Sequence, residues 1–230
     1  MTTVVNEFEN MDGQGHGVKI ENLAMMPAVF VPVFPWTNGL DYKMFAAKFP
    51  HMAGFIVLTK ERDTGRVYPD PVDGRCRIDY KTSSYDRKHM IEGIIATAKI
   101  AYSSGAKEFH TTCREFPPFI RSSQNNDTNN ADIQAWIAEV RRKASLDPER
   151  TLYASAHQMG SCRMGKNPRS GAVDPECQVW GTQGLYVLDA SVFPSASGVN
   201  PMITNMAIAD WASRNLAKSM ARSNGSVARL

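Results

Sequence analysis

The stretch GLYVLDASVFPSASGVNPMITNMAIADW, residues 184–211, contains an apolar strand-like run, a turn and the start of an apolar helix. LYVLD at 185–189 has the pattern of a buried strand. Pro201 suits the first turn of a helix, because the N–H that proline lacks would have no partner there. The apolar residues that follow form one broad face. We therefore predict a helix over about 201–217, with Asn200 as its N-cap.

The chain before this stretch alternates between hairpin, helix and loop signals. Residues 62–80, RDTGRVYPDPVDGRCRIDY, predict a hairpin, because turn-forming residues separate two short strand-like runs. Asp86 is expected to be the N-cap of a helix that keeps its apolar spacing until Gly105. After the polar loop at 122–130, apolar side chains recur at helical spacing and predict a second amphipathic helix around Ile133.

The composition is that of a globular protein. The chain has 230 residues, 43% of them hydrophobic, which is enough for one large domain or two small ones. The net charge is +3, and the 26 basic residues are spread among 23 acidic ones, which argues against a nucleic-acid partner. The four cysteines are Cys76, Cys113, Cys162 and Cys177. They form no C-x-x-C pair and no compact disulfide framework, so we expect a reducing compartment. The beginning MTTVVNEFENMDG lacks the features of a signal peptide, so we do not expect secretion.

The most apolar segment is AMMPAVFVPVFPW, residues 24–36. It is too short to cross a bilayer as a helix, and its three prolines would interrupt one. We interpret it as a buried extended segment. It could form a wall of an aliphatic binding site, although ordinary core packing is the more economical explanation.

Three polar residues near the C-terminal end are candidates for chemistry, and each also has a structural interpretation. His157, in HQMGSCRMG at 157–165, could be a core histidine bonded to backbone groups. Asp189 could cap the next turn, and Asn200 could cap the last helix. The spacing of the histidine and cysteines does not fit a zinc site, and no G-x-S-x-G motif indicates a hydrolase.

The order of these segments, HQMGSCRMG and then DASVFPSASGVNPM, resembles the C-terminal signature of the glucose-methanol-choline (GMC) oxidoreductases, a family of flavoproteins that oxidise alcohols. Within that family the run is most similar to the long-chain alcohol oxidases. The resemblance begins at about residue 66 and is closest from His157 to Leu216. It implies FAD as the cofactor.

The resemblance also implies roles for individual residues. His157 matches the catalytic histidine, and Asn200 matches a second catalytic position that other members fill with histidine or asparagine. The D-A-S segment would approach the ribityl and pyrophosphate region of FAD, and the N-P-M segment would meet the pyrimidine side of its ring. The residues implied in cofactor binding are Asp189, Ala190, Asn200, Pro201 and Met202.

The chemistry of alcohol oxidation suits these residue types. The hydroxyl proton must be removed while hydride leaves the carbon, and histidine side chains, with an unperturbed pKa of about 6.5, provide a neutral base at working pH. An asparagine at position 200 can hydrogen-bond the alcohol oxygen. The N-terminus of the helix after Pro201 offers partial positive charge to the negative charge of a reduced flavin.

The fold class implied is mixed α/β. We expect an α+β substrate-binding and catalytic domain over 1–180, with an antiparallel sheet and flanking helices. Residues 181–218 would be the returning strand and helix of an incomplete Rossmann-like FAD domain, followed by a polar tail at 219–230. GQGHG at 13–17 lacks the G-x-G-x-x-G spacing and is interpreted as a loop. We therefore expect a fragment that binds FAD weakly by itself, whose partner is the missing N-terminal FAD-binding half, from the same gene or a separate chain.

The predicted activity is oxidation of long-chain primary alcohols, with oxygen as acceptor and with aldehyde and hydrogen peroxide as products. Two alternatives stay open: a dehydrogenase of the same family with a non-oxygen acceptor, and a non-catalytic fragment acting as an interaction module. The ending Ala228-Arg229-Leu230 resembles the S-K-L peroxisomal address, although a chance tripeptide on a polar tail would look the same. We expect a peroxisomal or membrane-associated intracellular protein, with any membrane association made through absent segments.

Overall fold

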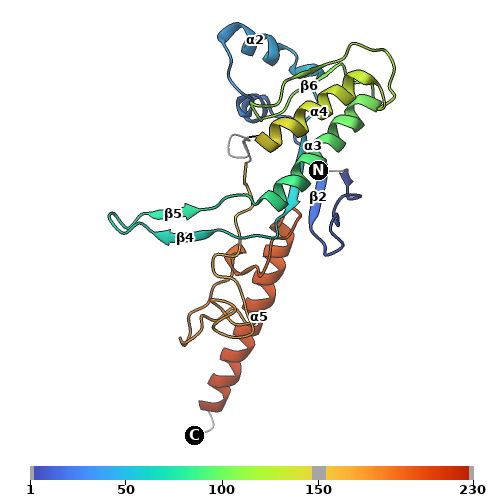
Figure 1. Ribbon diagram of the computed structural model, residues 1–230. Coiled ribbons are helices and arrows are strands. Elements are labelled where there is room, and N and C mark those ends of the chain that lie inside the picture. Colours follow the sequence, from blue (N-terminus) through green and yellow to red (C-terminus); the bar gives the residue numbers. More distant parts are fainter. Residues whose placement is uncertain (1–2, 147–153, 228–230) are drawn as a thin grey trace. The chain divides into compact units, whose positions relative to one another are not determined.

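The computed structural model describes residues 3–146 and 154–227. The ending Ala228-Arg229-Leu230 lies outside the described residues, so the peroxisomal address stays a prediction. Helices and small antiparallel sheets alternate along the chain (Figure 1), which confirms the mixed α/β class.

The chain forms two compact units. Unit 1 combines Met1–Glu61 with Thr82–Ala154, and unit 2 combines Arg62–Lys81 with Ser155–Leu230. The second unit thus begins well before the expected change of domain at residue 181. The division into substrate-binding and FAD-binding segments concerns function and stays a prediction.

A three-stranded antiparallel sheet forms one layer of unit 1. Its strands, in the order β1-β2-β3, are β1 (Val4–Val5), β2 (Gly17–Asn22) and β3 (Phe55–Lys60). The helix α3 (Ser84–Ser103) packs against β2 and β3. A Cβ added to Gly93 of α3 would lie 2.5 Å from Val57 Cγ1 and 2.9 Å from Val18 Cγ2. The glycine therefore permits the close approach of helix and sheet.

The start of α3 differs from the prediction. Ser83 is the N-cap: its Oγ accepts a hydrogen bond from the Asp86 N–H at 3.1 Å and donates one to Asp86 Oδ2 at 2.8 Å. The assignment of Asp86 as N-cap was wrong, because the aspartate occupies the third helical position, where its N–H and its carboxylate both bond the Ser83 hydroxyl. Gly105, with φ +88°, follows the end of the helix as predicted, because glycine adopts this conformation without strain.

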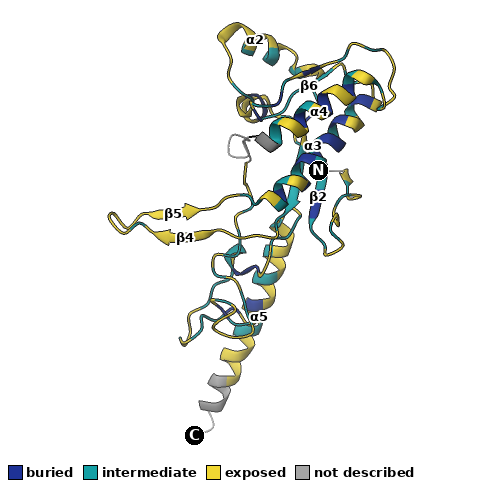
Figure 2. Ribbon diagram, viewed as in Figure 1, coloured by how far each residue is buried: buried dark blue, intermediate teal, exposed yellow. Residues whose placement is uncertain are grey.

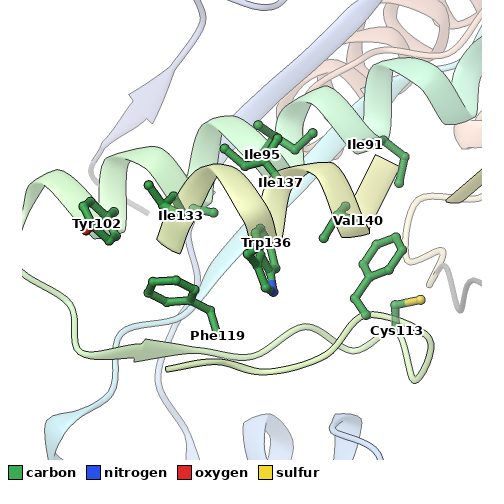
Figure 3. Close-up of a cluster of buried hydrophobic side chains, with 11 residues drawn as sticks. Ile91, Ile95, Tyr102, Cys113, Phe119, Ile133, Trp136, Ile137 and Val140 are labelled. Carbon is green, nitrogen blue, oxygen red and sulfur yellow. The ribbon is translucent and has the colours of Figure 1, made fainter. Parts of the chain in front are cut away.

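A hydrophobic cluster joins α3 to α4 (Ala131–Leu146) and to the short strands β6 (Glu108–Phe109) and β7 (Phe119–Ile120). Buried residues of unit 1 lie along the inward faces of α3 and α4 and along β2 (Figure 2). This confirms the amphipathic helix predicted around Ile133. Figure 3 shows Trp136 projecting from α4 into the cluster.

A polar network at the N-terminal end of α4 borders this cluster. The hydroxyl of Tyr102, which is fully buried, donates to Asp132 Oδ1 at 2.8 Å. The Arg121 guanidinium carbon lies 3.8 Å from the centre of the Tyr102 ring. Burial alone would raise the pKa of Asp132, but hydrogen bonds from Tyr102 and from the amides of Ser122 and Ile133 outweigh it and lower that pKa. The carboxylate is therefore held in its charged form.

We expect Tyr102→Phe to destabilise the protein more at neutral pH than in acid. The pKa of Asp132 is lowered in the folded state, so its charged form stabilises the folded chain. This stabilisation is fully present above the unfolded-state pKa of about 3.9. It is lost as the pH falls through the folded-state pKa. Urea unfolding of the wild-type chain and of Tyr102→Phe at a series of pH values measures the difference. A difference that does not change with pH would contradict this account.

Short helices connect β2 to β3. They are α1 (Pro27–Phe30), η1 (Val31–Val33), α2 (Gly39–Ala47) and η2 (Phe49–His51). Their inner side is aromatic: the Phe30 and Phe34 ring centres are 5.1 Å apart, and those of Phe34 and Phe45 are 4.9 Å apart. The connection therefore has a small aromatic core of its own.

The prediction of a buried extended conformation for residues 24–36 was wrong. Pro27 and Pro32 lie in the first turns of α1 and η1, where a missing N–H interrupts no helical hydrogen bond. Prolines thus begin these helices instead of preventing them. Four large apolar side chains of the segment are exposed, namely Met26, Val29, Val33 and Trp36. The suggested role as a wall of an aliphatic site stays a prediction.

Unit 2 contains the predicted hairpin and the last helix. The hairpin strands β4 (Arg66–Pro69) and β5 (Cys76–Asp79) pair antiparallel. The last helix, α5 (Met202–Val227), begins one residue after Pro201 and continues beyond the predicted end near 217. None of the helices in the described residues is both long enough and apolar enough to cross a membrane.

The predicted strand at 185–189 is not formed as a regular strand. Within the described part of the chain this run makes only an isolated antiparallel bridge, between Gln178 and Tyr186. Two flanking bonds, from Val179 N–H to the Leu185 carbonyl at 2.9 Å and from Val187 N–H to the Cys177 carbonyl at 3.0 Å, hold it to the preceding turn. The segment is also not buried, because Leu185 is 53% exposed and residues 186–188 are only half-buried. An apolar run becomes a strand only beside a neighbouring ladder, and here the run is held to a turn.

Candidate active site

The histidine segment, residues 157–165, is bound to the turn that contains Ala190. Its amides at Gly160, Cys162 and Met164 donate in order to the carbonyls of the η3 residues (Ala190–Val192). The three N–O distances are 3.2, 2.9 and 2.9 Å. The turn residues 190–192 and the segment bearing the half-buried His157 therefore form one hydrogen-bonded assembly.

The Asp189 side chain caps η3. Its Oδ1 accepts from the Ser191 N–H at 2.8 Å and also from the Ser191 hydroxyl. The Ser191 hydroxyl and N–H hold the pKa of the Asp189 carboxyl below its usual range. The capping interpretation of Asp189 is thus confirmed, and the side chain remains exposed. Contact of Asp189 and the half-buried Ala190 with FAD stays a prediction.

Asn200, Pro201 and Met202 form the entry to α5. The Asn205 N–H donates to the Pro201 carbonyl at 2.8 Å, so Pro201 provides the first helical acceptor. Asn200 therefore lies one position before the N-cap, and its assignment as N-cap was wrong by one residue. The error arose because a proline carbonyl can accept the first helical bond even though proline has no N–H to donate. Asn200 and Met202 are both exposed.

The inner face of α5 packs on the same assembly. Ala212 of α5 and Val192 of η3 belong to one buried cluster, against which Ile208 and Met164 also pack. Through this cluster the structure brings together the histidine segment, the D-A-S turn and the last helix. His157 and Asn200 thus come from segments that share a core, although they are far apart in sequence.

The outer face of α5 is apolar and exposed. Met202 is 68% exposed, Ile203 69%, Met206 61% and Trp211 48%. Isolated exposed apolar residues are normal, but Met202, Ile203 and Met206 lie within one turn of the helix and form a candidate contact surface. All four residues lie within the helix that the sequence predicted.

The start of α5 suits the polar edge of a flavin. The N–H groups of Met202, Ile203 and Thr204 precede the first helical bond, and all three residues are exposed. Asn205 Oδ1 is buried and has no hydrogen-bond partner among the described residues, so an acceptor remains for a bound donor. The donor set at the start of α5 is therefore compatible with the polar edge of a flavin, and contact of Asn200, Pro201 and Met202 with FAD stays a prediction. No cluster of three or more potential metal ligands occurs in the described parts of the chain.

Some residues of this assembly were not singled out in the sequence. Ser191 supports the Asp189 cap, and Gly160, with φ +81°, turns the histidine segment toward η3. A Cβ at Gly160 would lie 3.2 Å from the Phe193 carbonyl, so both conformation and space favour glycine. The D-x-S spacing, typical of an aspartate that caps a turn, could have identified Ser191.

A family model and two plant enzymes are similar to this chain. Residues 50–209 match the family model described as GMC oxidoreductase. The chain is 35% identical over 218 residues to the long-chain-alcohol oxidase FAO3 of Arabidopsis thaliana, covering 95% of this chain and 28% of that protein. It is 35% identical over 209 residues to FAO4A of the same plant, covering 91% of this chain and 27% of that protein. The chain therefore spans less than a third of the length of these relatives.

A solved structure shows a similar fold. The FAD-dependent oxidoreductase from Chaetomium thermophilum aligns with a TM-score of 0.50 and 21% sequence identity, over 85% of this chain and 33% of that chain. At this identity the likeness concerns the fold alone.

Proposed function

The chain belongs to the GMC oxidoreductase family, and from this premise we propose that it carries the alcohol-oxidising residues of an FAD-dependent oxidoreductase. The observation that carries the proposal is the hydrogen-bonded assembly of the His157 segment with the Asp189–Val192 turn, which packs against Ile208 and Ala212 of α5. These are the segments that the sequence resemblance associates with catalysis and with the flavin. The substrate class proposed is long-chain primary alcohols, since the plant relatives are named long-chain-alcohol oxidases.

His157 acts as the general base in this proposal. A ring nitrogen of the neutral imidazole accepts the hydroxyl proton of the alcohol, and the resulting imidazolium stabilises the oxygen as negative charge develops on it. Asn200, exposed at the entry to α5, donates a hydrogen bond from its side-chain amide to the same oxygen. The two residues together bind and orient the substrate carbon.

FAD, when bound, supplies the acceptor for the hydride that leaves this carbon. The residues that would hold it are Asp189, Ala190, Asn200, Pro201 and Met202, with the exposed N–H groups at the start of α5. The 230 residues include no G-x-G-x-x-G motif for the pyrophosphate. We therefore expect weak FAD binding by the isolated chain, and a stoichiometric flavin spectrum on the purified chain would contradict this.

The activity can be tested in a joined enzyme, in which the FAD-binding portion of a long-chain-alcohol oxidase precedes residues 1–230. With oxygen as acceptor, a long-chain primary alcohol should give aldehyde and hydrogen peroxide in equal amounts. Turnover that requires an artificial electron acceptor and releases no peroxide would instead indicate the dehydrogenase of the same family. Absence of turnover with either acceptor, despite bound flavin, would favour the non-catalytic interaction module.

The proposed partners of the chain follow from this activity. They are the alcohol, oxygen and an FAD-binding half that belongs to the same gene or to another chain. The exposed apolar face of α5, from Met202 to Trp211, is the surface we propose for contact with that half. A peroxisomal location would suit a peroxide-producing oxidase and is proposed on the C-terminal tripeptide alone.

A further inference from the structure

The η3 turn holds the histidine segment through backbone hydrogen bonds. Three consecutive carbonyls of the turn accept from alternate amides of the segment, at Gly160, Cys162 and Met164. A change in the shape of one short turn would therefore move three points of the segment together. The nearest of these points, Gly160, is three residues from His157.

The segment is also fixed on the other side of the histidine. The side-chain Nε2 of Gln158 donates to the Ser155 carbonyl at 2.8 Å and contacts the Ser155 hydroxyl at 3.3 Å. His157 therefore lies between a local loop, closed by Gln158, and the anchor at Gly160. The bond from Gly160 to the Ala190 carbonyl connects the histidine to η3, whereas the Gln158 bonds stay within the segment.

The shape of η3 depends on the Asp189 and Ser191 side chains. The Ser191 hydroxyl and N–H both donate to Asp189 Oδ1, which closes the turn around the serine. Ser191 is also the central residue of the anchor, because its carbonyl accepts from the Cys162 N–H at 2.9 Å. One residue thus joins the cap of the turn to the middle of the histidine segment.

We propose that Ser191 is a positioning residue for His157: by closing η3 on Asp189, it sets the register and orientation of the histidine segment. The proposal rests on the function proposed for His157. Ser191 itself contacts neither substrate nor the reacting atoms in this account. Its hydroxyl fixes the turn, the turn fixes three amides, and these amides limit the directions in which the imidazole can point.

The first test uses the 230-residue chain and amide hydrogen exchange. Ser191→Ala removes the hydroxyl bond to Asp189 but retains the backbone bond, so exchange at Gly160, Cys162 and Met164 should accelerate together, by about tenfold, which corresponds to one ordinary hydrogen bond. Ser191→Thr, which keeps the hydroxyl, should restore slow exchange. Ser213→Ala is the matched control, because it removes a hydroxyl bond to the Asp210 carbonyl on exposed helix α5. Unchanged exchange at the three amides in Ser191→Ala would overturn the proposal.

The second test measures alcohol-dependent flavin reduction in the joined enzyme. Ser191→Ala should lower kcat by about tenfold and alter its pH profile, while KM stays near the wild-type value, because the base is misoriented but substrate binding is retained. The rates are expressed per bound flavin, because Asp189 and Ala190 of the same turn are proposed to hold FAD. Ser191→Thr should recover the rate. Faster exchange without any change in kcat or pH profile would overturn the positioning role and leave the proposed function intact. If His157→Ala reduced flavin normally, the proposed function itself would fail.

Discussion

His157→Ala in the joined enzyme should lower the rate of flavin reduction by an alcohol by between about 10² and about 10⁴-fold. The imidazole is the group proposed to take the hydroxyl proton, and alanine leaves that step to water. The stability of the chain should change little, because His157 is only half-buried in an irregular segment. Anaerobic stopped-flow measurement of flavin absorbance gives the rate, and the flavin content of each variant must be equal.

His51→Ala is the matched control for this experiment. His51 ends η2 in unit 1 and is exposed, so its loss should leave the reduction rate unchanged. A His157→Ala enzyme that reduces its flavin as fast as His51→Ala would exclude His157 as the base.

Trp136→Ala should destabilise the protein by about 3–5 kcal/mol, the usual cost of removing a buried aromatic side chain. The Trp136 ring fills the cluster between α3 and α4, meets Phe109 edge-on at 5.0 Å and donates from Nε1 to the Pro117 carbonyl at 2.8 Å. Alanine leaves a cavity and an unpaired carbonyl. Because whole domains are stable by only about 5–15 kcal/mol, a large part of the stability of unit 1 should be lost.

Urea unfolding compares this variant with Trp211→Ala. Trp211 is 48% exposed and belongs to neither buried cluster, so its replacement should cost clearly less than that of Trp136, about 1–2 kcal/mol. If both substitutions destabilised the chain equally, Trp136 would not be the centre of the core described here.

The elements that sequence predicted well are those whose signals are local. The apolar spacing around Ile133 and the turn residues between β4 and β5 each determined the correct structure. Helix starts were less certain, because Ser83 and Asp86 are both good capping residues and only their mutual hydrogen bonds show which one precedes the helix.

The wrong predictions have two causes: some depended on neighbours that the local sequence does not specify, and others misread a local signal. An apolar run such as 185–189 becomes a strand only when another strand pairs with it. In the apolar segment the misread signal was local: residues 27–33 are helical because Pro27 and Pro32 lie where helices begin. In the site, His157 and Asn200 could be chosen from motifs, whereas the contact of Ser191 with the histidine segment depends on tertiary hydrogen bonds.

Anaerobic mixing of the joined enzyme with a long-chain primary alcohol tests most directly whether this chain carries the alcohol-oxidising residues. We predict that the absorbance of the oxidised flavin disappears and that an equimolar amount of aldehyde forms. A bound flavin that dithionite reduces but the alcohol does not would contradict the account.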